Sequence, residues 1–222
     1  LSAFYAKEMG LPIGRLLCAS NSNNVLTDFI ATGKYDRNRP FYNTVSPPMD
    51  ILISSNLERL LYLLSGGDDK LVAGYMKELS DTGCYQVSGE MLEKIQSVFV
   101  GGFSSEEETE ATIGKMMDEH KYLIDTHTAV AFHVLEQYRK DTGDQTKTVV
   151  ASTASPFKFC DAVLDALHVT EKATGTALLD QLADVSGMPA PQPLATLKDK
   201  KVRFTSWTEK EQMRAVVTDF LK

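Results

Sequence analysis

The sequence predicts an α/β fold in which helices cover a mostly parallel sheet. Short apolar runs that suit buried strands alternate with longer segments whose apolar residues recur at helical spacing. Strands separated by helices are typical of parallel sheets, because a crossover must bring each strand back in the same direction. We expect strands at four apolar runs, residues 15–20, 97–103, 147–153 and 201–207.

The first part of the chain has the order of a βα unit. An opening helical segment ends near Gly10, because glycine is common just after a helix. The predicted strand at residues 15–20 is followed by a polar turn and by a helix that ends at Gly33. An irregular, proline-containing connection then leads to a helix whose core-facing residues are Ile53, Leu57, Leu60, Leu61 and Leu64.

The middle of the chain carries two further helix signals. After the predicted strand at residues 97–103, Ser105 and Glu108 have the spacing of a capping box, which starts a helix with an acidic first turn. The next helix begins near the sequence DTHTAVAF, and its shared face comprises His127, Val130, Ala131, Val134, Leu135 and Tyr138.

The last part of the chain repeats the strand-and-helix order. After the predicted strand at residues 147–153, Ser155 and Pro156 suit the cap and first position of another helix. After the predicted strand at residues 201–207, Thr208 and Glu211 suggest a capping box for the closing helix. The apolar stripe of that helix comprises Met213, Val216, Val217 and Phe220.

Composition limits the classes of function. The net charge is −7 and there is no basic run, so we expect no binding to nucleic acid. No apolar stretch approaches the roughly 20 residues that a membrane-spanning helix needs. Three widely spaced cysteines favour a reducing, cytoplasmic setting over a disulfide framework.

The histidines do not suggest a metal centre. None belongs to a cluster with cysteines, so we expect no metal ligands in this chain. His127 shares a face with apolar residues, which favours a buried structural histidine over a catalytic one.

The stretch VVASTASPFKF, residues 149–159, places hydroxyl side chains where a strand is expected to give way to a helix. Such junctions often bind ligands in α/β proteins, because helix amide groups point toward the ligand. Capping of the helix by Ser155 explains part of the pattern without any ligand. Both interpretations remain open on spacing alone.

Several segments together resemble the C-terminal half of threonine synthase, an enzyme of fold type II that uses pyridoxal 5′-phosphate (PLP). The likeness runs in order along nearly the whole chain, through YAKEMGLPI, NNVLTDFIATGKY, SPPMDILISSNLERLL, DTHTAVAF and VVASTASPFKF. It implies that residues 1–222 are the C-terminal, large-domain portion of such an enzyme, and that the N-terminal half with the catalytic lysine is absent.

The resemblance also implies roles for two residues. The hydroxyl of Thr153 would donate a hydrogen bond to the pyridine nitrogen of PLP, and Ser152 would support the same loop. The lysine that forms the Schiff base is expected upstream, so no catalytic residue is expected in this chain. Lys158 is expected to be a surface or capping cation.

The implied reaction converts O-phospho-L-homoserine and water to L-threonine and phosphate. We expect the fragment alone to be inactive, and either to self-associate or to bind the missing N-terminal half. Two alternatives remain: a related PLP-dependent phospho-lyase that does not make threonine, and a non-enzymatic α/β module.

Overall fold

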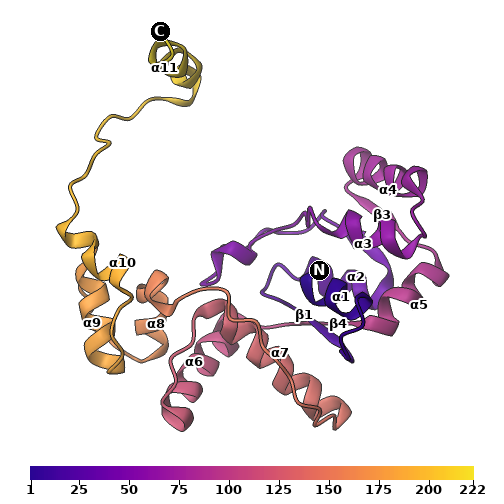
Figure 1. The fold of residues 1–222 in the computed structure, drawn as a ribbon, viewed down its shortest axis with the longest axis horizontal. Coiled ribbons are helices and arrows are strands. Elements are labelled where there is room, and N and C mark those ends of the chain that lie inside the picture. Colours follow the sequence, from indigo (N-terminus) through magenta and orange to yellow (C-terminus); the bar gives the residue numbers. More distant parts are fainter.

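A pair of parallel strands lies at the centre of the fold in the computed structural model, which describes residues 1–222 (Figure 1). Strands β1 (Leu16–Ser20) and β4 (Phe99–Phe103) pair in register, with Leu16 opposite Phe99 and Ser20 opposite Phe103. The two strands predicted at residues 15–20 and 97–103 are therefore confirmed, and so is their parallel direction.

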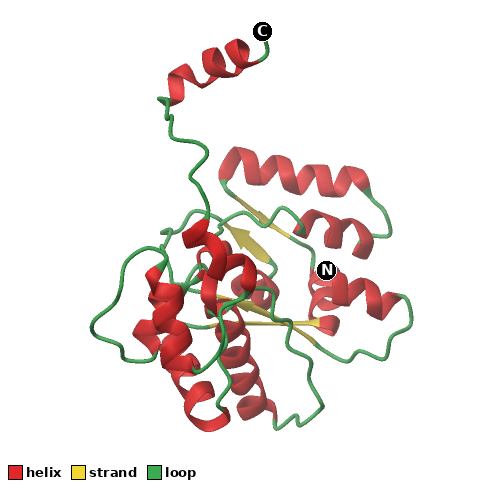
Figure 2. Ribbon diagram, turned by 60° about the vertical axis from the view of Figure 1, so that its left-hand side comes forward, coloured by secondary structure: helices red, strands yellow, loops and turns green.

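Helices surround this pair and make up most of the regular structure, as Figure 2 shows in red. Four short 3-10 turns lie between them, η1 (Pro47–Met49), η2 (Pro156–Lys158), η3 (Thr196–Asp199) and η4 (Lys210–Gln212). The α-helices are α1 (Ser2–Glu8), α2 (Val25–Thr32), α3 (Leu57–Leu64), α4 (Asp69–Thr82), α5 (Gly89–Val98), α6 (Glu106–His120), α7 (Thr126–Thr142), α8 (Cys160–Ala166), α9 (Ala177–Ser186), α10 (Gln192–Ala195) and α11 (Met213–Phe220).

Two adjacent glycines of β4 allow helices to pack closely on both faces of the strand pair. A Cβ atom on Gly101 would lie 2.9 Å from the Cα atom of Thr27 in α2. A Cβ atom on Gly102 would lie 2.6 Å from Cγ1 of Val134 in α7. Because successive residues of a strand face opposite sides, α2 and α7 cover opposite faces of the pair.

A second, antiparallel pair of strands was not predicted from the sequence. Strands β2 (Lys34–Asp36) and β3 (Cys84–Gln86) place Tyr35 directly opposite Tyr85. Their rings stack at 5.3 Å between centroids, and the ring of Tyr75 stacks on Tyr85 at 5.2 Å. These rings belong to the first hydrophobic core, which α2 to α5 enclose.

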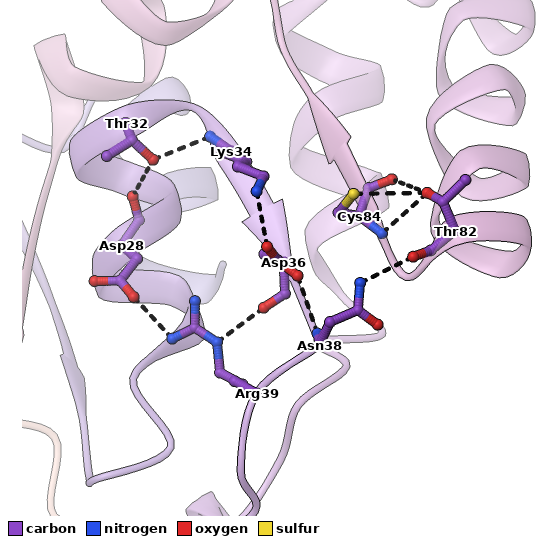
Figure 3. Close-up of polar contacts among 8 residues, drawn as sticks. All are labelled: Asp28, Thr32, Lys34, Asp36, Asn38, Arg39, Thr82 and Cys84. Atoms are coloured by element: carbon purple, nitrogen blue, oxygen red, sulfur yellow. Dashed lines mark hydrogen bonds and ion pairs between the residues drawn. The ribbon is translucent and has the colours of Figure 1, made fainter.

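Polar contacts fix the loop that follows β2 (Figure 3). Arg39 donates from Nε to the carbonyl of Asp36, at 2.8 Å, and pairs with the carboxylate of Asp28 in α2, also at 2.8 Å. Asn38 donates to the carbonyl of Thr82 at 2.9 Å. The loop therefore leaves the antiparallel pair in a defined direction, toward the end of β1.

The helical hairpin of α6 and α7 connects this first core to a second one. The capping box predicted at Ser105 and Glu108 is present at the start of α6, since each residue's side chain bonds the other's backbone N–H. The second core packs α6, α8 and α9 together through Ile113, Leu123, Ile124, Ala129, Phe157, Cys160, Val163, Leu164, Ala166, Leu179 and Leu182.

Two predicted strands are absent. Residues 147–153 and 201–207 form no strand, and Val149 and Trp207 are 93% and 83% exposed. A strand requires a neighbouring strand to complete its hydrogen bonds, and neither run forms a backbone–backbone hydrogen bond. Apolar alternation alone was therefore an insufficient signal.

The helix predictions at residues 53–64 and 208–220 had the right type but the wrong extent. Helix α3 begins only at Leu57, so Ile53 lies before it and is 48% exposed. Helix α11 begins at Met213 with Gln212 at its N-cap, so the capping box predicted at Thr208 is absent. Its apolar stripe is exposed, because an extended segment holds α11 away from the rest of the chain (Figures 1 and 2).

The chain contains no helix with the length and apolar character that crossing a membrane demands. All three cysteines are free thiols.

We predict that side chains added at the two glycines of β4 destabilise the protein. Gly101→Ala should lower the free energy of unfolding by about 2–3 kcal/mol, because backbone of α2 must move, and Gly102→Ala by about 1–3 kcal/mol. Urea unfolding followed by circular dichroism measures both changes. Gly74→Ala in α4 is the control, since no atom lies within 4 Å of its added Cβ and a small gain is expected. Equal stability of Gly101→Ala and the wild type would contradict the packing described here.

Candidate functional site

Several element ends meet at the carboxyl ends of β1 and β4. The backbone N–H of Ser104 donates to the carbonyl of Ser20 at 3.0 Å and extends the ladder to this edge. Helices α2 and α6 begin just beyond it. The C-terminal end of α7 lies at the opposite, amino edge of the strands. There it lines a surface hollow together with Arg15, which precedes β1, and Gln96, which precedes β4. The first turn of α7 therefore lies at the carboxyl edge, the usual ligand side of a parallel sheet.

A buried asparagine fixes the loop that covers this edge. Asn21 is 1% exposed and follows β1 directly. Its amide nitrogen lies 2.9 Å from Oγ1 of Thr44, 3.1 Å from Oγ of Ser46 and 2.7 Å from Oδ1 of Asp50. Buried polar groups are stable only when they are hydrogen-bonded, so this cluster holds the loop in one conformation.

The same loop is also tied to α6. The carboxylate of Glu106, in the first turn of α6, accepts a hydrogen bond from the backbone N–H of Val45 at 2.7 Å. Burial raises the pKa of the Glu106 carboxyl, and the Val45 hydrogen bond opposes that rise without cancelling it. Nearby Glu110 and Asp50 raise the pKa further.

Asp125 caps α7 and accepts four hydrogen bonds at this edge. Its side chain is fully buried and accepts from the backbone N–H groups of His127, at 2.9 Å, and Thr128, at 3.3 Å. It also accepts from Nδ1 of His127 at 3.0 Å and from the hydroxyl of Thr128. Burial raises the pKa of the Asp125 carboxyl, but these hydrogen bonds outweigh burial and hold the pKa below its usual value.

His127 is buried between this carboxylate and an aromatic ring. Its side chain is 9% exposed, and its ring lies 4.7 Å from the ring of Phe159. Nδ1 bonds Asp125, whereas the buried Nε2 has no hydrogen-bond partner. This arrangement fits the predicted structural role, and the free Nε2 leaves one hydrogen-bonding position unfilled.

The structure places the two predicted cofactor-binding residues on an exposed turn beside α7. Oγ of Ser152 lies 3.0 Å from Oγ1 of Thr128. Thr153 is exposed, and its hydroxyl forms no hydrogen bond within the chain. The turn therefore presents a neutral hydroxyl that is free to bond a ligand.

Ser155 caps a turn, as predicted, but the turn is not the start of the α-helix. Its hydroxyl accepts from the backbone N–H of Phe157 at 3.3 Å, with Pro156 at the first position of η2. Helix α8 starts only at Cys160. Lys158 ends η2 and is exposed, in agreement with the surface cation that we expected.

Analysis of the sequence missed the residues that hold the turn. Asp125 and Thr128 are a cap residue and a first-turn threonine, and the sequence DTHT does carry the cap signal. Nothing in it indicates a contact with Ser152, which is 24 residues away along the chain.

Comparison with known proteins gives one consistent result. Residues 128–217 match the family model described as threonine synthase, C-terminal. Threonine synthase from Saccharomyces cerevisiae is 36% identical to this chain over 236 residues, an alignment that covers 100% of this chain and 44% of the yeast protein. The chain belongs to the threonine synthase family.

Solved structures of threonine synthases share the fold. The yeast enzyme superposes with a TM-score of 0.84 at 32% identity, over 99% of this chain and 44% of the yeast chain. PLP-bound threonine synthase from Brucella melitensis gives a TM-score of 0.81 at 33% identity, over 99% of this chain and 42% of that chain. The α/β fold predicted from the sequence is therefore that of the C-terminal portion of a threonine synthase.

The chain is also similar to a protein that is not itself named threonine synthase. Threonine synthase-like 1 from Homo sapiens is 40% identical over 191 residues, which cover 85% of this chain and 25% of the human protein. The chain spans less than half the length of each of these relatives.

We predict that Asp125→Asn destabilises this member of the family in a pH-dependent way. An aspartate whose pKa is lowered by folding contributes stability above its unfolded pKa of about 3.9, and that contribution is lost as the pH falls through the folded value. The variant should lose about 1–3 kcal/mol of the free energy of unfolding at pH 7, because buried hydrogen bonds are broken. The difference from the wild type should shrink below about pH 4.

Denaturant unfolding at both pH values measures this difference. Asp68→Asn is the matched control, because Asp68 caps α4 at an exposed position with one hydrogen bond to Leu71 N–H. A loss at Asp125 no larger than that at Asp68, or one that grows as the pH falls, would contradict the assignment.

Proposed function

We propose that this chain forms one wall of the active site of a PLP-dependent threonine synthase. The complete enzyme would convert O-phospho-L-homoserine and water to L-threonine and phosphate. The observation that carries the proposal is the free hydroxyl of Thr153, held at the carboxyl edge of the parallel strands in a chain of this family.

The donors present at the turn suit the ring of PLP. A pyridine nitrogen accepts a hydrogen bond, and Thr153 offers a neutral hydroxyl without another partner. No carboxylate bonds Thr153. Asp125, the carboxylate of the adjoining network, already accepts hydrogen bonds from His127 and Thr128. The residues therefore fit a cofactor whose ring nitrogen is bonded by a hydroxyl.

When bound, PLP supplies an electron-accepting ring that stabilises negative charge on the carbon atoms of the substrate. Thr153 would hold the ring nitrogen and set its hydrogen-bonding state. A hydroxyl leaves the nitrogen less strongly charged than a carboxylate would. Ser152 would anchor the turn, and Ser155 would hold η2 behind it.

The lysine that binds PLP covalently is proposed to lie outside these 222 residues. Lys158 is the nearest lysine to Thr153 along the chain, but it is exposed at the end of η2. The proton transfers at the substrate would then fall to the lysine of the other portion, and this chain would position the cofactor ring.

A second candidate is a PLP-dependent phospho-lyase that releases a different product. The chain is 40% identical to human threonine synthase-like 1, a relative named as similar to threonine synthase and not as the enzyme itself, so the product needs a direct test. Product analysis of the complete protein with O-phospho-L-homoserine separates the two candidates. Threonine supports the first, and a keto acid supports the second.

We predict that Thr153→Ala weakens retention of PLP in the complete protein about tenfold, because one hydrogen bond to the ring is lost. Turnover should fall with it, and Thr153→Ser should restore most of both. Cofactor absorbance after dialysis measures retention. Thr170→Ala, an exposed threonine beyond the other end of α8, is the control. Unchanged retention and turnover in Thr153→Ala would refute the role of Thr153.

A further inference from the structure

The turn that carries Thr153 has very little support of its own. Residues 147–154 form no backbone–backbone hydrogen bond with any part of the chain. Between Val149 and Ala154, the contact of Ser152 with Thr128 is the one hydrogen bond. The position of the turn therefore depends strongly on a single side-chain pair.

One hydroxyl connects the turn to Asp125. The hydroxyl of Thr128 contacts two oxygens, Oδ2 of Asp125 and Oγ of Ser152, the latter at 3.0 Å. An ionised carboxylate can only accept, so Thr128 donates to Asp125. The same hydroxyl contacts Ser152, so Thr128 links the turn to the buried carboxylate.

A second contact holds the other end of the same segment. The ring of His127 packs on the ring of Phe159 at 4.7 Å, and Nδ1 of His127 bonds Asp125. Asp125 thus hydrogen-bonds both residues that contact the segment, Thr128 at Ser152 and His127 at Phe159. The first turn of α7 therefore contacts both ends of the segment 152–159, Ser152 through Thr128 and Phe159 through His127.

We propose that Asp125 and Thr128 are positioning residues that orient Thr153 toward the cofactor through the hydroxyl of Ser152. The inference rests on the proposed function for its ligand, the ring of PLP. Neither residue touches the ring in this scheme. They act by holding a turn that has no backbone hydrogen bonds to a neighbouring strand.

The hydroxyl of Thr128 can be separated from the capping of α7. Asp125 caps the helix through backbone N–H groups, which a change of the Thr128 side chain leaves in place. Thr128→Val removes the hydroxyl with almost no change of volume, and Thr128→Ser keeps it. Thr112→Val is the matched control, because Thr112 is also buried and its hydroxyl bonds only the carbonyl of Glu108 within α6.

The experiment measures cofactor dissociation and the absorbance spectrum of bound PLP in the complete protein. Thr128→Val should release PLP about tenfold faster, as expected for one lost hydrogen bond, and should shift the spectrum. Thr128→Ser and Thr112→Val should both stay within about twofold of the wild type. Wild-type dissociation and spectrum in Thr128→Val, or equal effects in Thr128→Val and Thr112→Val, would overturn the proposal.

A second readout tests, without PLP, whether the contact of Thr128 with Ser152 restrains the turn. With ¹⁵N-labelled threonine, the order parameter of the Thr153 amide should fall in Thr128→Val and not in the other two variants. An unchanged order parameter overturns the inference. A different result would separate the two proposals. If the wild-type protein binds no PLP but the order parameter of Thr153 still falls in Thr128→Val, the proposed function is contradicted and the positioning role of Thr128 stands.

Discussion

The close approach of two helices to the glycines of β4 determines where the rest of the structure lies. Because Gly101 and Gly102 have no side chains, α2 and α7 reach the backbone of the parallel pair from opposite faces. The contact at Gly102 sets the position of α7 along the strands, so that its first turn reaches their carboxyl ends. Asp125, at the start of α7, and the turn that it supports are placed by this packing.

The carboxyl edge that results joins the two hydrophobic cores. The first core supplies β1 and the loop held by Asn21, and the second supplies η2 and α8 behind Thr153. Helix α7 packs on β4 through Val134 and contributes Ala129 to the second core. Loss of the α7 packing should therefore disturb the site more than loss of any single loop contact.

Local signals in the sequence predicted much of this fold. The capping box at Ser105 and Glu108 and the two central strands are confirmed, whereas Ser155 caps the short turn η2 and not the predicted α-helix. The strands predicted at residues 147–153 and 201–207 are absent, since neither run forms backbone hydrogen bonds with a neighbouring strand.

The candidate site was predictable only in part for the same reason. Resemblance to the family pointed to Ser152 and Thr153, and those roles remain predictions. The pairing of Ser152 with Thr128 depends on how α7 lies across β4. No periodicity or motif expresses such a long-range hydrogen bond, so the supporting residues emerged only from the structure.

The most direct test of the split site is covalent trapping. The 222-residue chain is incubated with PLP and reduced with borohydride, and its intact mass is compared with that of the complete protein treated alike. We expect no adduct at a defined lysine of this chain, and one adduct per complete protein at a lysine outside it. A single defined adduct on a lysine of this chain would contradict the view that it forms only the Thr153 wall of the site.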